Sequence, residues 1–231
     1  MKIQILKQIE GARKARGTAV IIDVFRAFTL ECYLRAAGAA RILPAGSMET
    51  AYRMKEEHPE ILLVGERHGV MLPGFQFGNS PSQIKGADLR GKTIVHTTSA
   101  GTQGVAGASH AEEILTGSLV NAKAIADYLK KKNCQEVSLV CMGWEGTQDS
   151  PEDILCARYI KSLLEDTPFD MDGELKRLRF TSEGAKFFLP ENQSVFPKED
   201  YWMCTDVDRF DFVLKVKRLG ADLFESSPAE A

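Results

Sequence analysis

The stretch GKTIVHTTSAGTQG, residues 91–104, holds the strand, turn and helix pattern on which the fold prediction rests. Residues 92–98 carry β-branched and apolar side chains typical of a strand, and residues 99–108 carry small side chains that favour a turn into a helix. The stretch also completes GADLRGKT, residues 86–93, which fits the phosphate-loop pattern G-x-x-x-x-G-K-[ST]. In a phosphate loop the Lys and Thr open a helix, whereas here they open a strand. We therefore expect a tight turn and no nucleotide binding at residues 86–93.

Similar apolar runs recur on both sides of this stretch, each followed by a helical pattern. Strands are expected at residues 19–22, 40–45, 60–67, 112–117 and 136–143. Helices are expected at residues 28–37, 47–58 and 118–132, and from Ser150 to about Leu164. A short helix is also expected to begin at Ser80. This alternation predicts an α/β fold with a mostly parallel sheet covered by helices on both faces.

The chain is predicted to form a single α/β domain over residues 1–231. Periodicity weakens at residues 166–197, where a small helical insertion is expected. Residues 202–216, WMCTDVDRFDFVLKV, have an extended pattern that predicts one or two edge strands.

Composition excludes several classes of protein. Hydrophobic residues make up 44% and charged residues 26% of the chain, an ordinary globular mixture. A net charge of −3 lacks the basic excess of nucleic-acid binders, and the absence of an 18-residue apolar run argues against a membrane span. The polar N-terminus and five cysteines without a C-x-x-C pair favour a cytoplasmic protein with free thiols. A homo-oligomer is left open.

Polar residues collect where the predicted strands end. In a parallel sheet these ends form one crevice, where ligands bind. We predict catalytic carboxylates at Asp23, Glu66, Glu145 and Asp153, with Asp23, Glu66 and Asp153 as Mg²⁺ ligands. The predicted substrate-binding residues are Arg26, Arg67, Asn79, Ser80, Thr97, Thr98, Ser99, Gly101, Thr102, Asn121, Cys141 and Gly143. Carboxylates with room for water suit Mg²⁺, and arginines with helix N-termini suit anions. The pattern therefore indicates a metal-assisted site for a small, highly anionic ester.

Each of these residues also has a structural explanation. Asp23 and Asn121 are good helix caps, and Thr98 or Ser99 can cap the helix that follows. Arg67 can form a surface ion pair, Asp153 fits a capping box, and Cys141 fits a small buried side chain. Known phosphatase motifs give no alternative nucleophile, because a C-x5-R motif at Cys141 would need arginine where Thr147 stands, and Asp23 lacks the D-x-D partner.

The order of motifs resembles the 2-phosphosulfolactate phosphatase family. The matching pieces include VIIDVFRAFT, GERHGVMLPGFQFGNSPSQI, GKTIVHTTSAGTQG, TGSLVNAKAIADYL, VCMGWEGTQDSPEDILCA and FPKEDYWMCTDVDRFDFV, which together span nearly the whole chain. The resemblance implies a three-layer α/β/α sandwich and a Mg²⁺-dependent phosphatase that releases 3-sulfolactate, a step toward coenzyme M in some organisms.

One departure affects the substrate. Many family members carry Asn-Gly-Thr in the turn where this chain has Ser99-Ala100-Gly101-Thr102. The alternatives are therefore a phosphatase of another small phosphorylated hydroxy acid, or a non-catalytic protein that binds small anions on the same fold.

Overall fold

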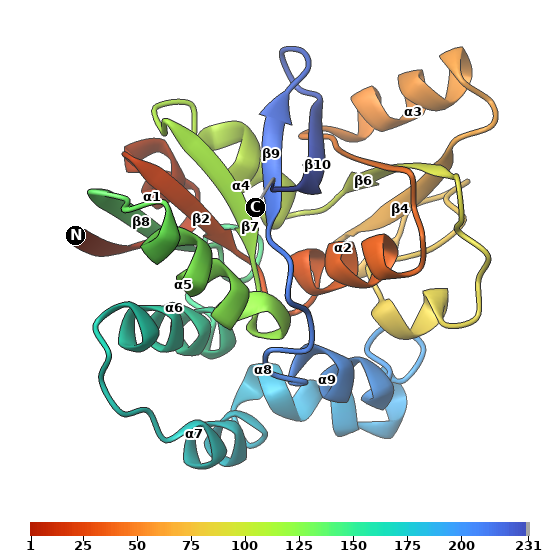
Figure 1. The fold of residues 1–231 in the computed structure, drawn as a ribbon. Helices are drawn as coiled ribbons and strands as arrows, with labels where there is room; N and C mark the ends of the chain where they lie inside the picture. Colours follow the sequence, from red (N-terminus) through yellow and green to blue (C-terminus); the bar gives the residue numbers. More distant parts are fainter. Residues whose placement is uncertain (230–231) are drawn as a thin grey trace.

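A ten-stranded mixed sheet forms the middle layer of the computed structural model, which describes residues 1–229 (Figure 1). The strands are β1 (Lys2–Lys7), β2 (Thr18–Ile22), β3 (Arg41–Pro44), β4 (Leu62–Arg67), β5 (Val70–Met71), β6 (Thr93–Thr97), β7 (Glu113–Gly117), β8 (Glu136–Cys141), β9 (Leu214–Arg218) and β10 (Phe224–Pro228). Their order across the sheet is β1-β8-β2-β7-β9-β10-β3-β6-β4-β5. Helices cover both faces, so the predicted three-layer α/β/α sandwich is confirmed.

The helices match most of the predicted helical segments. They are α1 (Gln8–Lys14), α2 (Ala27–Ala36), α3 (Met48–Glu57), α4 (Gly101–Gly107), α5 (Ala122–Lys131), α6 (Pro151–Leu164), α7 (Met171–Leu178), α8 (Ser182–Ala185) and α9 (Lys198–Cys204). Short 3₁₀ turns are η1 (Pro81–Ile84), η2 (Leu119–Asn121), η3 (Lys186–Phe188) and η4 (Pro190–Asn192). Within residues 1–229, no helix has both the length and the apolar character needed to cross a bilayer.

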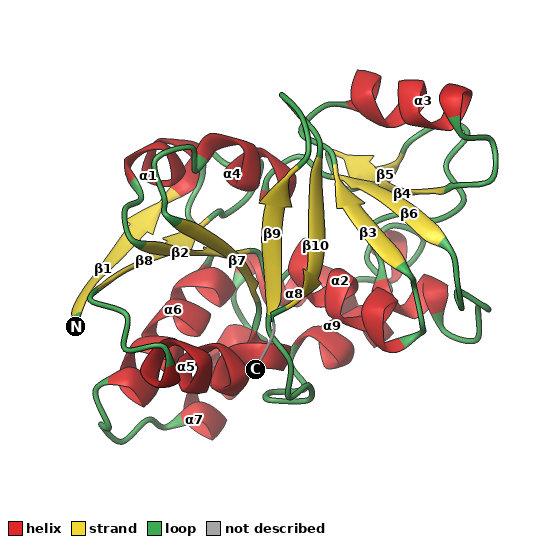
Figure 2. Cartoon of the chain, turned by 45° about the horizontal axis from the view of Figure 1, so that its top comes forward, coloured by secondary structure: helices red, strands yellow, loops and turns green. Residues whose placement is uncertain are grey.

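The sheet consists of two parallel sets of strands joined by an antiparallel hairpin. Strands β1, β8, β2 and β7 are parallel to one another, and so are β3, β6 and β4. The β9–β10 hairpin lies between the sets and pairs antiparallel with both (Figure 2). The pairs β7–β9, β9–β10 and β10–β3 are all antiparallel, so the strands of one set run in the opposite direction to those of the other.

A flat sheet with this topology would place the carboxyl ends of the two sets at opposite edges. Sheets twist with a fixed hand, and the twist accumulates from strand to strand. Here the turn after β2 and the turn after β6 meet: a Cβ atom added at Gly101 would lie 2.9 Å from Oδ2 of Asp23. The shared crevice predicted for a parallel sheet therefore forms between two sets of strands.

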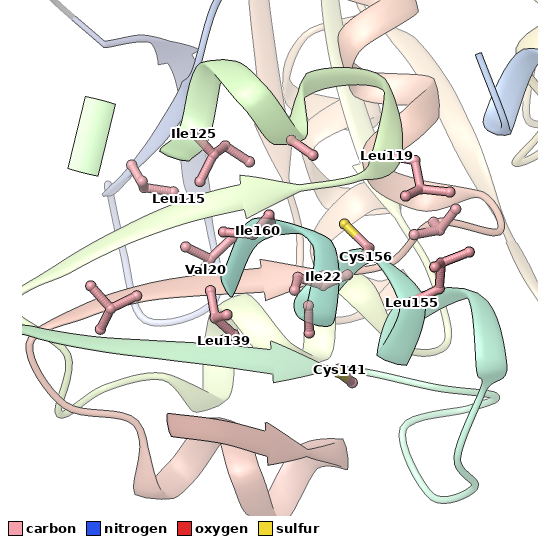
Figure 3. Close-up of a cluster of buried hydrophobic side chains, with 14 of the residues drawn as sticks. Val20, Ile22, Leu115, Leu119, Ile125, Leu139, Cys141, Leu155, Cys156 and Ile160 are labelled. Carbon is pink, nitrogen blue, oxygen red and sulfur yellow. The ribbon is translucent and has the colours of Figure 1, made fainter. Parts of the chain in front are cut away.

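Strand β2 is buried on both faces because helices pack on each side of it. Its Val20 and Ile22 side chains join the core beneath α5 and α6 (Figure 3). Its Ala19 and Ile21 side chains face α1 and α4. An uninterrupted apolar strand of this kind is typical of a sheet covered on both sides. It also means that Asp23, the first residue beyond the strand, is held on a rigid scaffold.

The two ends of the chain differ from the predicted pattern in different ways. Residues 2–14 form β1 and α1, for which no element had been predicted. The extended pattern at residues 202–216 had predicted edge strands, whereas Trp202 lies in α9 and β9 lies near the middle of the sheet. The position of β9 depends on its partner strands, which local sequence does not specify.

The segment expected to be an insertion, residues 166–197, contains α7, α8, η3 and η4. Helix α7 packs against α6, and η3 packs against α9. The segment lies below the sheet in the view of Figure 1 and leads into α9. It therefore belongs to the surroundings of the crevice described next.

Candidate functional site

A pocket lies where the carboxyl ends of the two strand sets meet. It is lined by Asp23, Phe25, Arg26, Glu66, His68, Gly69, Asn79, Ser99, Ala100, Gly143, Trp144, Glu145 and Phe196. Glu66 lies near the end of β4, Asn79 precedes η1 and Phe196 precedes α9, and the other lining residues follow strands β2, β4, β6 and β8. The pocket is therefore assembled from both halves of the sheet and closed by the C-terminal third of the chain.

Asp23 is a buried carboxylate at the start of α2. Its Oδ1 accepts a hydrogen bond from the Ala27 backbone N–H at 3.1 Å, and the Gly101 N–H also donates to the carboxylate. Burial, which is the largest cause, and the nearby Glu66 carboxylate together raise the pKa of Asp23 to about 6 against the opposing effect of these amides. Asp23 therefore lacks a full counter-charge within the protein.

Glu66 is held by the turn that follows β6. Its Oε1 accepts from the Ser99 backbone N–H at 2.7 Å, and its Oε2 accepts from the Ser99 hydroxyl at 3.1 Å. The Gly69 N–H also donates to Oε2 at 2.6 Å. Asp23 and Glu66 thus line one pocket with the same sign of charge, each fixed by backbone donors.

The backbone amides of the turn after β6 were expected to bind an anionic ligand. In the structure they are bonded to groups of the protein itself. The Ser99 and Gly101 amides donate to Glu66 and Asp23. The Thr98 and Thr102 amides donate to the hydroxyl groups of Thr102 and Thr98, respectively. Thr98 and Thr102 are fully buried and act as a local cap, outside the pocket lining. Helix α4 thus uses its N-terminal amides on the protein's own carboxylates.

Arg26 is the buried cation of the pocket. Its Nη1 donates to Oδ2 of Asp200 and to the Val195 carbonyl, both at 2.8 Å. The guanidinium lies over the Phe196 ring, 4.9 Å from its centroid, and the Phe25–Arg26 peptide bond is cis. Among residues 1–229, no acceptor is bonded to Nε or Nη2 of Arg26. These two donors can therefore bind an anionic group in the pocket.

Arg67, which was predicted to bind substrate, is not among the residues that line the pocket. Successive side chains of a strand point to opposite faces, and β4 includes both Glu66 and Arg67. Glu66 faces the pocket, while Nη2 of Arg67 donates to Oγ1 of Thr97 at 2.9 Å and Nη1 to the Glu66 carbonyl. Thr97 is fully buried, and its hydroxyl accepts this hydrogen bond from Arg67.

Asp153 positions loops instead of lining the pocket. Its two carboxylate oxygens accept from the Val24 and Gly143 backbone N–H groups, each at 2.8 Å. Burial raises the pKa of Asp153 well above its usual range. Asp153 is not among the residues that line the pocket, so the structure does not place it beside Asp23 and Glu66 there. Gly143, held by this contact, does line the pocket.

Cys141 and Asn121 also lie outside the pocket and have structural roles. The Cys141 thiol is buried and donates to the Asp153 carbonyl, and burial raises its pKa, which opposes a thiolate role. The Asn121 amide accepts from the Ser118 N–H as part of a capping box. In both cases the structural explanation holds.

Two neighbouring residues before η1 have different roles. Asn79 lines the pocket, is almost fully buried, and its Oδ1 has no hydrogen-bond partner among residues 1–229. Ser80 lies behind the pocket and donates through its hydroxyl to Asp200 at 2.9 Å. A buried amide oxygen without a partner is uncommon and indicates a site where a ligand or water binds.

The mouth of the pocket carries an ion pair between loops of the two strand sets. Nδ1 of His68 lies 2.5 Å from Oε1 of Glu145, and both residues line the pocket. The Glu145 carboxylate raises the pKa of His68, whose side chain is exposed. Glu145 was predicted as a catalytic carboxylate; the structure places it at the rim, paired with an imidazole.

Six residues that line the pocket were not predicted as site residues: Phe25, His68, Gly69, Ala100, Trp144 and Phe196. Asp200, which bonds to Arg26, was not predicted either. His68 and Trp144 adjoin predicted site residues, so their positions after strands β4 and β8 could have indicated them. Phe196 and Asp200 lie in the weakly patterned C-terminal third. The motif FPKED was noted there, but nothing local shows that it meets Arg26.

No three carboxylate, histidine or cysteine side chains of residues 1–229 converge closely enough to form a protein-only metal centre. Asp23 and Glu66 are the two buried carboxylates that line the pocket. Mg²⁺ commonly binds through one or two carboxylates and completes its shell with water and substrate phosphate. The donor set therefore fits Mg²⁺ bound with a substrate.

Comparison with known proteins agrees with the motifs. Residues 3–218 match the family described as 2-phosphosulpholactate phosphatase. The chain is 33% identical over 202 residues to a "Probable 2-phosphosulfolactate phosphatase" of Bacillus subtilis, covering 87% of each chain. It is 43% identical over 165 residues to a protein of the same name from Carboxydothermus hydrogenoformans, covering 71% of this chain and 68% of that one. The chain therefore belongs to the 2-phosphosulfolactate phosphatase family.

Proposed function

We propose that this protein is a Mg²⁺-dependent phosphoric monoester hydrolase that converts 2-phosphosulfolactate to 3-sulfolactate and phosphate. The observation that carries the proposal is the pairing of two buried carboxylates, Asp23 and Glu66, with the unshared donors of Arg26 in one pocket. Membership of the family and the names of its relatives support the reaction class and substrate.

Asp23 and Glu66 would hold the metal. Two carboxylates of like charge in a poorly solvated pocket repel each other, and a divalent cation between them offsets that repulsion. When bound, Mg²⁺ supplies positive charge that stabilises the phosphoryl oxygens as charge develops in the transition state. The backbone donors that fix both side chains keep their carboxylates oriented before substrate arrives.

Arg26 would bind the substrate directly. A phosphate monoester carries about −1.5 to −2 charges at neutral pH, and the proposed substrate adds a carboxylate and a sulfonate. The planar fork of Nε and Nη2 can donate two parallel hydrogen bonds to one such group. Trp144 and Phe196 line the pocket with apolar surface, which would strengthen these electrostatic contacts by displacing water around a bound substrate.

The attacking group is either water or Asp23 itself. Asp23 satisfies the burial and orientation that either role requires, since Ala27 and Gly101 fix its carboxylate. A rapid quench with substrate labelled in the phosphoryl group separates the two roles. Label trapped on Asp23 shows an acyl-phosphate and therefore attack by the carboxylate.

The test is phosphate release by the purified protein from 2-phosphosulfolactate, phospholactate and an aryl phosphate, each with Mg²⁺ and with EDTA. We expect Mg²⁺-dependent turnover with the highest kcat/KM for 2-phosphosulfolactate. A preference for phospholactate would support a phosphatase of another hydroxy acid. No release from any ester, with measurable phosphate binding, would support a non-catalytic anion-binding protein.

A further inference from the structure

Asp200 of α9 lies directly behind the pocket and contacts two of the segments that line it. Its side chain is fully buried. Its Oδ2 accepts from Nη1 of Arg26 at 2.8 Å, and its Oδ1 accepts from the Ser80 hydroxyl and the Ser82 N–H, both at 2.9 Å. One carboxylate therefore joins the start of α2, the loop before η1, and α9.

The contacts of Asp200 decide how Arg26 faces the pocket. A guanidinium has five N–H donors in a rigid plane. Nη1 of Arg26 is committed to Asp200 and to the Val195 carbonyl, and the plane lies over Phe196. The remaining donors, Nε and Nη2, are therefore set toward the pocket by contacts on the opposite side.

The same carboxylate holds the loop that carries Asn79. Ser80 and Ser82 donate to one oxygen of Asp200, and Asn79 is the residue before Ser80. Asn79 enters the pocket with a buried Oδ1 that lacks a partner. Because the orientation of an amide is assigned and can be reversed, Asn79 can present either its oxygen or its N–H₂ to a bound hydroxy acid.

We propose that Asp200 is the positioning residue of the site, and that it sets Arg26 and Asn79 together for the anionic substrate. This proposal rests on the proposed function. Asp200 does not line the pocket, so it acts through these two residues and touches no substrate. The C-terminal third of the chain thereby becomes part of the recognition machinery, since α9 supplies Asp200 and the preceding segment supplies Phe196 and the Val195 carbonyl.

A matched control lies one residue earlier on the same helix. Glu199 also joins α9 to the region of η1, through a 2.6 Å ion pair with Lys85, but both side chains are exposed. An exposed ion pair of this kind contributes little. Asp200→Asn and Glu199→Gln make the same chemical change in adjacent residues, so they separate positioning from a general effect on α9.

The experiment compares kcat, KM and affinity for inorganic phosphate among wild type, Asp200→Asn, Ser80→Ala and Glu199→Gln. We expect Asp200→Asn to lower kcat/KM by roughly 10- to 100-fold, mainly through KM, since small misplacements of binding groups have effects of that size. Ser80→Ala should cause a smaller loss in the same direction. Glu199→Gln should stay within about twofold of wild type.

A double-variant cycle tests whether Asp200 acts through Arg26. Added to Arg26→Gln, the Asp200→Asn change should cost much less in kcat/KM than it does alone, because the group it positions is gone. Additive losses would overturn the proposal. So would a folded Asp200→Asn or Ser80→Ala variant with wild-type kcat/KM and phosphate affinity.

Two further measurements keep the outcomes separate. Near-ultraviolet circular dichroism and melting temperature report whether Asp200→Asn folds. If it does not fold, the phosphate affinity of Ser80→Ala decides whether Asp200 positions the site. That variant leaves the Arg26–Asp200 ion pair intact. If wild type hydrolyses no ester, the proposed function fails, while loss of phosphate affinity in the variants still supports positioning by Asp200 and unchanged affinity overturns it.

Discussion

The turns after β2 and β4 look alike in sequence but differ in structure. Each places an acidic residue and an arginine at the end of a strand: Asp23 with Arg26, and Glu66 with Arg67. Both carboxylates line the pocket, but of the two arginines only Arg26 lines it. The difference arises because β2 ends at Ile22 and the chain turns into α2, so that Arg26 stands at the N-cap.

Arg67, in contrast, is the last residue of β4 and still follows the alternation of a strand. Its neighbour Glu66 faces the pocket, so Arg67 must face the opposite side. The comparison teaches that an arginine beyond a strand can join the site, whereas one within the strand beside a site residue cannot. Replacing residues in the two turns tests this difference, from the largest expected effect to the smallest.

Asp23→Asn should lower kcat by several orders of magnitude. It removes the charge that would bind Mg²⁺ or attack phosphorus, and each 1.36 kcal/mol of lost transition-state stabilisation is tenfold in rate. Phosphate release under saturating Mg²⁺ measures the effect. Near-normal turnover would make Asp23 a helix cap and shift the catalytic role to the β4 turn.

Gly101→Ala should lower kcat/KM by roughly 10- to 100-fold, since it displaces Asp23. An added Cβ would lie 2.9 Å from Oδ2 of Asp23 and 2.9 Å from Cβ of Ala27, both on rigid elements. Gly107→Ala, in the same helix, is the control, because its Cβ would meet its nearest atom at an ordinary 3.5 Å. Equal losses in the two variants would show that α4 itself, and not the contact with Asp23, is sensitive.

Much of this arrangement could be predicted from the sequence. Apolar strands followed by helices specified the layers, and the ends of β2, β4, β6 and β8 specified where polar residues collect. Asp23, Arg26, Glu66, Ser99 and Gly143 line the pocket as their positions suggested. What local sequence could not provide was pairing across the chain, because the partner of a strand is decided by tertiary packing.

The missed and misplaced residues follow from that limit. The hairpin of β9 and β10 joins the two strand sets, yet its sequence resembles an edge strand. Asp200 meets Arg26 from 174 positions away. Thr98 was assigned to the site although it accepts from the nearby Thr102 amide, as its capping pattern had also allowed. Asp153 was assigned to the site too, but its carboxylate binds the Val24 and Gly143 amides and does not cap α6.

Arg26→Lys should raise KM by about tenfold with a smaller change in kcat. Lysine keeps the charge, but a single ammonium cannot bind Asp200 and also present a planar fork to the substrate. Steady-state kinetics with 2-phosphosulfolactate measure both constants. A fall in kcat at unchanged KM would contradict a role in ground-state binding.

The pH dependence of stability should report the unpaired charge of Asp23. Its folded-state pKa of about 6 exceeds the ordinary aspartate pKa of 3.8, so the folded protein binds an extra proton between these two pH values. The stabilisation that this group gives the folded protein at low pH is therefore lost as the pH rises from about 4 to about 6. In EDTA, the melting temperature of Asp23→Asn should rise relative to wild type by a few degrees between pH 4 and 7. A constant difference across this range would contradict the raised pKa.

Arg67→Lys should have the smallest effect, within about twofold in both kcat and KM, because partly exposed polar contacts contribute little. Arg67 is half-buried, and its two bonded nitrogens reach Thr97 and the Glu66 carbonyl, on the side away from the pocket. Lysine can still donate to one of these oxygens, so a small drop in melting temperature is the main consequence expected. Arg26→Lys, the same substitution in the other turn, is the matched comparison. If Arg67→Lys raised KM as much as Arg26→Lys does, Arg67 would have to reach the substrate, and strand alternation would not explain which arginine serves the site.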